Sequence, residues 1–278
     1  STECVWQIGG MCMMERQLPQ AVSSPLANFS ASAAKTLPLS GHHGLHLRGL
    51  AYGTHYRHKD PQSNIQPDYS YYNGTLSAGY DYADARNHFS LLPYFEYDFR
   101  NGHTQYRAWG ADADWSRAIT PRWRINARAG AKRYHYSGGS KTYYADYSQY
   151  ELGAGAEFSL TPSAGLFANL DATRRKYPSD VSSSYEYAAR LGAYKLFGNG
   201  IYLNGLLLHR RSLYDAAGFL SDGERRQDKQ AVAIVAAGWR RPKGITPELR
   251  FRRTVARSNS VYYRYRQNEV LLSLRYQF

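Results

Sequence analysis

The sequence contains no long apolar segment and only two cysteines. Its mean hydropathy is −0.61 over 278 residues, and no run of about 18 apolar residues occurs, which excludes a transmembrane helix. Cys4 and Cys12 are too few for a disulfide framework or a cysteine zinc site. The opening residues STECVWQIGG lack the basic start and apolar core of a signal peptide. The chain is therefore either cytoplasmic or a mature or trimmed form, and the strand pattern of the rest of the chain favours the second.

Tyrosine, in contrast, is abundant: the chain has 26 Tyr, and 15% of its residues are aromatic. The last residues alternate in polarity, with one face formed by Val270, Leu272, Leu274, Tyr276 and Phe278. The other face holds Glu269, Ser273, Arg275 and Gln277, with Leu271 as the exception. Because successive side chains of a strand point to opposite faces, this segment predicts a strand with one apolar and one polar face.

The same alternation recurs along the chain. It is clearest at 73–82, 89–99, 123–132, 150–160 and 185–193, and less regular at 201–210 and 231–239. Short connections are expected near 40–42, 84–86, 118–122, 161–164, 198–200 and 240–245. Longer ones are expected near 57–68, 99–104, 136–147, 175–184, 211–228 and 257–266. Short turns that alternate with long loops are typical of a barrel that spans a membrane.

We therefore predict an all-β fold, a transmembrane antiparallel up-and-down β-barrel of about 14 strands. About thirteen strands are expected over 25–278, which form the barrel domain. Residues 1–24 are an N-terminal segment with a possible first strand at about 4–16. With the C-terminal Phe278 in the periplasm, every short turn falls on the periplasmic side, and an even strand count places both termini there.

Aromatic residues near strand ends favour a membrane barrel over a soluble sandwich, which would bury its apolar faces between two sheets. The expected periplasmic girdle is Trp115, Trp123, Tyr80, Tyr82, Tyr276 and Phe278. The expected outer rim is Tyr52, Tyr69, Tyr71, Tyr72, Tyr143, Tyr144, Tyr147, Tyr262 and Tyr263.

In a membrane barrel the polar faces line the lumen. The polar residues expected there are Glu151, Glu157, Arg124, Arg128, Lys132, Glu248, Arg250, Arg252, Thr254, Glu269, Ser273 and Arg275. They carry both signs of charge, which suits transient contacts better than tight ion binding. Leu274, Tyr276 and Phe278 resemble the terminal signal of outer-membrane barrels, which implies the barrel-assembly machinery as a partner.

The net charge of +13, from 35 Lys and Arg against 22 Asp and Glu, raises the question of nucleic-acid binding. The arginine pairs are scattered over strand ends and loops: 174–175, 210–211, 225–226, 240–241 and 252–253. We therefore expect lumen or lipopolysaccharide contacts and no nucleic-acid partner. The adjacent His42 and His43 would point to opposite sides, so they are poorly placed to bind one metal ion together.

No catalytic site or cofactor is expected. Asp112 and Asp114 share a strand face, but no His or Ser constellation accompanies them in the sequence. Cys4 and Cys12 would lie about 26 Å apart in one extended strand, beyond disulfide reach. A turn at Gly9 and Gly10 would permit a disulfide, which the periplasm allows.

Several segments together resemble the barrel of the surface lipoprotein assembly modifier (Slam) family. They are WSRAITPRW at 115–123, GFLSDGERRQDKQ at 218–230, GITPEL at 244–249 and RSNSVYYRYRQNEVLLSLRYQF at 257–278. The resemblance lies in their order and spacing, covers about 25–278 and is strongest from 218 onward. It implies a fourteen-stranded outer-membrane barrel, preceded in the family by a periplasmic helical-repeat domain that is absent from this chain.

The resemblance also implies a function: moving lipoproteins, such as transferrin- or haemoglobin-binding types, or related secreted haem-binding proteins, to the cell surface. A surface lipoprotein client, outer-membrane lipid and a periplasmic repeat domain on the full-length or a partner chain are the implied partners. Three alternatives remain: a passive pore or exporter of solutes or polysaccharide, an outer-membrane hydrolase, and a structural barrel that only binds a partner.

Overall fold

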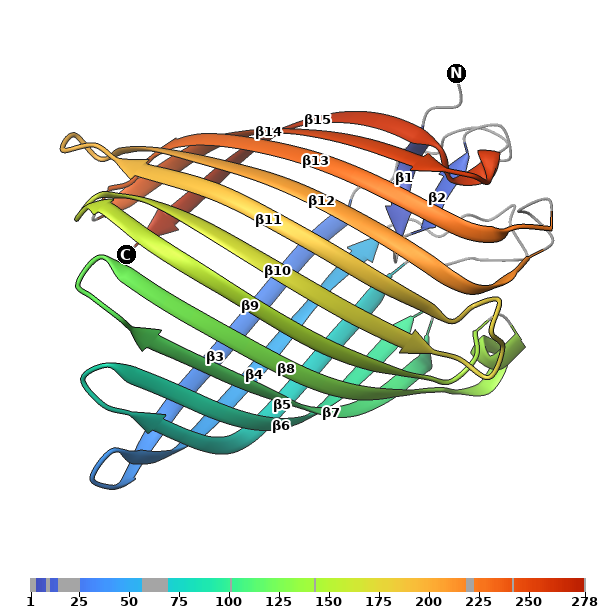
Figure 1. Ribbon diagram of the computed structural model, residues 1–278, viewed down its shortest axis with the longest axis horizontal. Helices are drawn as coiled ribbons and strands as arrows, with labels where there is room; N and C mark the ends of the chain where they lie inside the picture. Colours follow the sequence, from blue (N-terminus) through green and yellow to red (C-terminus); the bar gives the residue numbers. More distant parts are fainter. Residues whose placement is uncertain are drawn as a thin grey trace.

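The computed structural model describes residues 4–8, 11–14, 26–56, 70–100, 102–142, 144–218, 223–241 and 243–277. Nearly all of them form long antiparallel strands that curl into a barrel (Figure 1). Two short 3₁₀ helices occur in the connections, η2 (Gly138–Thr142) and η4 (Val261–Tyr263). Within the described residues, no helix is long and apolar enough to cross a membrane.

Thirteen strands form one sheet in which each strand pairs with its neighbours in sequence. The first seven are β3 (Leu26–Ser40), β4 (His43–Tyr56), β5 (Tyr71–Ala83), β6 (Asn87–Arg100), β7 (His103–Ala118), β8 (Trp123–Tyr136) and β9 (Tyr147–Thr161). The others are β10 (Ala164–Lys176), β11 (Ser184–Leu196), β12 (Ile201–Ala217), β13 (Arg225–Trp239), β14 (Gly244–Ser258) and β15 (Tyr265–Gln277). This confirms the predicted all-β up-and-down fold.

The N-terminal segment differs from the single strand expected at about 4–16. β1 (Cys4–Ile8) and β2 (Met11–Met14) pair with each other in a separate two-stranded sheet. Gly9 and Gly10 lie between them in sequence, and a Gly–Gly pair favours a tight hairpin connection over a continuous strand. In this hairpin Cys4 is opposite Met14 and Cys12 is opposite Gln7. The cysteine side chains lie outside the described part, so the disulfide stays a prediction.

Both termini were expected at the same end of the barrel, and the position of this hairpin differs from that expectation. Figure 1 places β1 and β2 at the end of the barrel with the long connections, whereas β15 ends at the side of the short turns. The described N-terminal strands and the end of β15 therefore lie on opposite sides. Which side faces the periplasm stays a prediction.

The alternation of short and long connections agrees with the sequence at most positions. One expected long loop, at 99–104, is wrong: β6 ends at Arg100 and β7 begins at His103. Asn101-Gly102 is the strongest short hairpin signal, and Gly102 adopts the left-handed φ of 77° that such a turn requires. The loop expected at 211–228 is also shorter, because β12 continues to Ala217, where Arg174 pairs with Asp215 across the strands.

The two faces of the sheet have the opposite polarity from a soluble protein. Large apolar side chains on one face are exposed, such as Leu76 at 71%, Leu152 at 66% and Leu170 at 66%. On the other face polar side chains are buried, such as Asn73 at 4% and Asp98 at 2%. An apolar outward face and a polar inward face are what a lipid-facing barrel requires.

Candidate functional site

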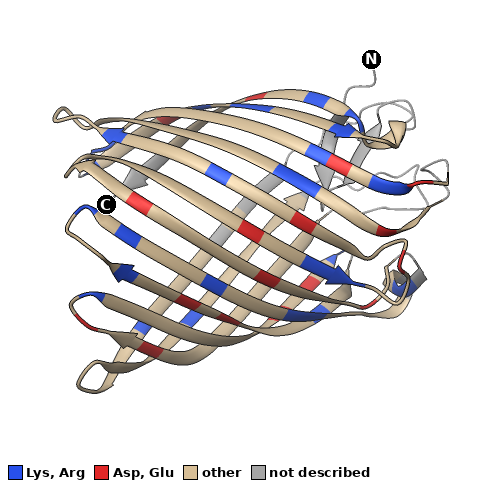
Figure 2. Ribbon diagram, in the orientation of Figure 1, with Lys and Arg blue, Asp and Glu red and all other residues tan. Residues whose placement is uncertain are grey.

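The inward face of the barrel carries the chemistry of this protein. Charged residues of both signs occur along the middle of the strands (Figure 2). Most inward charges are joined in networks that reach across two or three strands. We call the polar inward face of β4–β15 the lumen face.

The first network lies on β5–β8 around the Glu96 carboxylate. Glu96 accepts hydrogen bonds from the Tyr106 hydroxyl at 2.5 Å and from the Asn73 amide at 3.0 Å. Lys132, two strands away on β8, also donates to it. The same Asn73 amide lies 3.2 Å from Asp98, which pairs with Arg100. Every carboxylate of this network therefore has a cationic partner, as buried charges require.

The second network lies at the centre of the lumen face around Asp171 on β10. Arg128 on β8 donates to one oxygen at 2.5 Å, and Arg190 on β11 donates to the other. Arg128 reaches Asp171 by lying over β9, where residue 153 is glycine. A Cβ on Gly153 would lie 2.5 Å from Asp171 and 2.7 Å from Arg128. The glycine therefore provides the space in which this ion pair forms.

The third network is built around Glu186 on β11. Arg175 and Arg210 each approach it at 3.2 Å from the neighbouring strands. Arg175 also donates to the Gln149 side chain at 3.1 Å, which links this network to β9. Two cations and one carboxylate share the site, so it has a small positive excess.

Tyrosine side chains cover the lumen face near the long connections. Tyr147 stacks on Tyr134 with ring centroids 4.3 Å apart and on Tyr177 at 4.4 Å. Burial raises the pKa of Tyr177, which lies in the connection after β10. These tyrosines remain neutral and supply hydroxyl groups and flat apolar surface together.

Several of the tyrosines expected at the outer rim face the lumen. Tyr52, Tyr71 and Tyr147 are on the lumen face, because Tyr52 is registered opposite Asn73, Tyr71 lies two residues before Asn73, and Tyr147 lies two before Gln149. Arg100 lies over the Tyr71 ring at 5.4 Å. Trp123, which is expected in the periplasmic girdle, faces outward, and its ring centroid lies 4.6 Å from that of Phe158. Tyr69 and Tyr143 lie outside the described residues.

The residues expected in the lumen fall on the lumen face wherever the structure describes them. Glu151 accepts a hydrogen bond from Gln149 at 2.5 Å, and Arg124 is registered opposite Glu157. Lys132 and Arg128 belong to the networks above. Their assignment as functional contacts stays a prediction.

On β14 and β15 the expected lumen residues also meet one another. Glu248 accepts hydrogen bonds from Tyr202 at 2.6 Å and from Arg250 at 2.7 Å. Arg252 lies 3.6 Å from Glu269. Of the expected assembly signal, Leu274 is exposed on the outward face. Phe278 and the side chains of Arg275 and Tyr276 lie outside the described part.

The acidic centres of the three networks, Glu96, Asp171 and Glu186, were not among the expected lumen residues, although the alternation at 185–193 already places Glu186 opposite the apolar face. Each one alternates with outward apolar residues, as Asp171 does with Leu170, so the period-two rule applied to every strand would have placed them inward. Their partners come from strands that are distant in sequence. The alternation of polar and apolar residues along a strand does not show which side chain of another strand will be the partner.

Asp112 and Asp114 also face inward. Asp114 is registered opposite Arg128, but Arg128 pairs with Asp171 instead. Within the described residues, no group of three or more His, Cys, Asp or Glu is arranged to hold a metal ion.

Comparison with known proteins agrees with the resemblance stated above. The profile of the surface lipoprotein assembly modifier family (SlipAM) matches residues 4–278. The chain belongs to this family. Hemophilin secretion modulator of Acinetobacter baumannii is 28% identical over 277 residues, which cover 95% of this chain and 52% of that protein. This chain therefore spans about half the length of that relative.

Solved structures with a similar chain path are outer-membrane proteins of low identity. OmpT of Vibrio cholerae is 7% identical, with a TM-score of 0.47 over 94% of this chain and 99% of that one. OprD of Pseudomonas aeruginosa is 9% identical, with a TM-score of 0.44 over 90% of this chain and 89% of that one.

Proposed function

We propose that this barrel carries a client protein across the bacterial outer membrane: a lipoprotein destined for the cell surface or a secreted protein of the hemophilin type. The observation that supports this most is a continuous, charge-paired lumen face in a chain of the surface lipoprotein assembly modifier family. The relative's name, a secretion modulator, points the same way. No catalytic step is proposed.

The lumen face suits passage of an extended chain. Unpaired backbone groups are costly in lipid, so a client segment needs a polar path. Side chains such as Glu151 and Gln149 can exchange hydrogen bonds with it. Asp171 and Glu96 are already neutralised by cations, so these two carboxylates would not hold a client tightly.

A second route follows the sheet edges. In the part of the chain that is described, β15 pairs with β14 and β3 pairs with β4, and neither edge has a second partner strand. An exposed edge can accept a strand of another chain by β-augmentation. We propose the lumen as the path and treat the β15 edge as the competing outcome.

Surface display tests the function. The full-length protein, and this barrel with a separate periplasmic repeat domain, are expressed beside a candidate surface lipoprotein in cells that lack both. External protease and antibody labelling should show more lipoprotein at the surface only when the barrel is present. Background display for every client tried, with the barrel folded in the outer membrane, would contradict the proposal.

Site-specific photo-crosslinking tests the path. A crosslinker at Glu151 faces the lumen, and one at the adjacent Leu152 faces outward, so the two positions form a matched pair. Client crosslinks from position 151 and not 152 are expected. Crosslinks from the β15 residue Val270 instead would move the path to the sheet edge.

A further inference from the structure

Cations on the two faces of β12–β15 differ in whether they have partners. Arg210 faces the lumen and lies 3.2 Å from Glu186. Its sequence neighbour Arg211 points outward, where its recorded polar contact is the neutral Gln227 side chain at 3.3 Å. We call five of the outward cations of these strands the outer basic patch: Arg211, Lys229, Arg253, Arg257 and Arg266.

The pairing register brings three members of the outer basic patch into one row. Arg211 is opposite Lys229 on β13, and Lys229 is opposite Arg257 on β14. Like charges directly opposite one another destabilise a sheet. Among the described residues, no carboxylate forms an ion pair with any member of the patch.

The outward carboxylate closest in sequence to Arg211 is already engaged. Asp215 accepts two hydrogen bonds from Arg174, at 2.7 and 2.5 Å. The patch therefore needs anions from outside the described chain. In a membrane barrel, the surroundings of an outward side chain are lipids.

The outer basic patch begins where the outward apolar positions end. On β12, Leu203 and Leu207 precede Arg211, and on β14, Leu249 and Phe251 precede Arg253. In both strands the cations lie toward the end with the long connections. Arginine is costly in the hydrocarbon layer but is attracted to anionic groups at the membrane surface.

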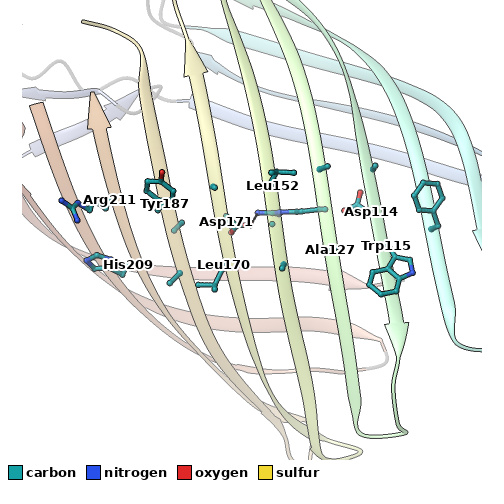
Figure 3. A pocket seen from close by; sticks show the side chains of 18 residues that line it. Asp114, Trp115, Ala127, Leu152, Leu170, Asp171, Tyr187, His209 and Arg211 are labelled. Atoms are coloured by element: carbon teal, nitrogen blue, oxygen red, sulfur yellow. Dashed lines mark hydrogen bonds and ion pairs between the residues drawn. The ribbon is translucent and has the colours of Figure 1, made fainter. Parts of the chain in front are cut away.

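An apolar groove continues from the patch along the outward face (Figure 3). It has a volume of about 910 Å³. Arg211 and His209 lie at one end, near the long connections, and Trp115 lies at the other, near the short turn after β7. Its floor is formed by the small outward residues Ala113, Ala127, Ala129, Ala154, Ala172 and Ala189.

We propose that the outer basic patch binds the phosphate groups of lipid A, the anchor of lipopolysaccharide, and that one of its acyl chains lies in the groove. Arginine forms bidentate hydrogen bonds with phosphate, and a row of cations on adjacent strands matches a glycolipid with more than one phosphate. The apolar groove beside the cations suits the acyl part of the same molecule. Lipid binding at this site is independent of the client that the barrel carries.

The test measures lipid A bound to the purified full-length protein after folding in vesicles. Variant R211Q/K229Q/R257Q removes three charges from the patch. Variant R122Q/R240Q/R241Q removes three exposed charges at the short-turn end and serves as the matched control. We expect at least a fivefold loss of bound lipid A in the patch variant and less than a twofold change in the control.

Three further binding measurements on the unmodified protein identify the ligand. Their result does not depend on whether the patch variant folds. Dephosphorylated lipid A and phosphatidylglycerol vesicles should bind at least fivefold more weakly than lipid A. Inorganic phosphate should compete only at concentrations far above those of lipid A. Equal binding of dephosphorylated lipid A, or of phosphatidylglycerol, would overturn the proposal, as would unchanged lipid A content in a folded patch variant.

Discussion

Strand β9, in one wall of the barrel, and strand β14, in another, follow the same alternation but differ on their outward faces. On β9 the outward positions are apolar from Tyr150 to Leu160, roughly 34 Å of strand at about 3.4 Å per residue. On β14 they are apolar without interruption from Ile245 to Phe251, roughly 20 Å.

The difference in length between these two apolar stretches is a sizeable fraction of the thickness of a membrane. Transmembrane strands tilt by about 45°, which converts these lengths to heights of roughly 24 and 14 Å, and the apolar band of such barrels is about 25 Å tall. The outward face of β9 therefore matches a full apolar band. The uninterrupted apolar stretch of β14 is shorter by roughly 10 Å, and on this strand Arg253 and Arg257 of the outer basic patch follow it.

A cation introduced into each wall should give the largest contrast. Leu152→Arg places an arginine in the middle of the apolar β9 face, where we expect a loss of about 2–4 kcal/mol in the free energy of unfolding. Val255→Arg, between Arg253 and Arg257, should cost less than about 1 kcal/mol. Denaturant unfolding in vesicles measures both, and equal losses would show that the two walls meet the same lipid environment.

Removal of one carboxylate tests the inward face. Asp171→Asn leaves Arg128 and Arg190 without their shared anion, and we expect a loss of about 1–3 kcal/mol in unfolding free energy. The control is Asp180→Asn, which breaks the exposed pair with Lys176 and should cost less than about 1 kcal/mol. If Asp171→Asn is as mild as the control, solvent already screens the lumen pair.

A smaller effect is expected from filling the space over β9. Gly153→Ala puts a Cβ between Arg128 and Asp171 and should cost about 1 kcal/mol by lengthening their hydrogen bond. Gly74→Ala is the matched control on the outward face, because no heavy atom lies within 4 Å of the added Cβ. Thermal unfolding of the two variants should separate them, with Gly74→Ala neutral or slightly stabilising.

The smallest effect concerns the turn between β5 and β6. Backbone N–H groups of Asn87 and Arg86 donate to Asp84 and hold the pKa of its carboxyl well below the usual range. Because the folded-state pKa is lowered, this contribution is present above the unfolded pKa of about 3.9 and is lost as pH falls through the folded pKa. Asp84→Ala should lower the melting temperature slightly at pH 7, with the difference shrinking in acid. A constant difference would exclude the charge as its cause.

The positions of most strands were predictable from the sequence, because the alternation of apolar and polar residues is a local property of each strand. The pattern of Leu152, Ala154 and Ala156 against Glu151 and Gly153 already assigns the face of β9. The prediction failed where a different local signal applied. β6 ends at Arg100 and β7 begins at His103 where a longer loop was expected, and β12 continues past its apolar positions to Ala217, with Asp215 paired to Arg174.

The sequence alone therefore determined the number of strands, which face of the sheet is apolar and which face each side chain occupies. Side chains alternate between the two faces of a strand, and this alternation depends on the strand alone. The sequence alone did not determine that Arg128 meets Asp171 instead of the opposite Asp114, or that Arg211, Lys229 and Arg257 form one row without a carboxylate. Those contacts depend on the register between strands and on the curvature that brings β8 within reach of β10. Ion pairs form between side chains that are close in space, and that closeness arises only when the strands have paired in register and the sheet has curved around the lumen face.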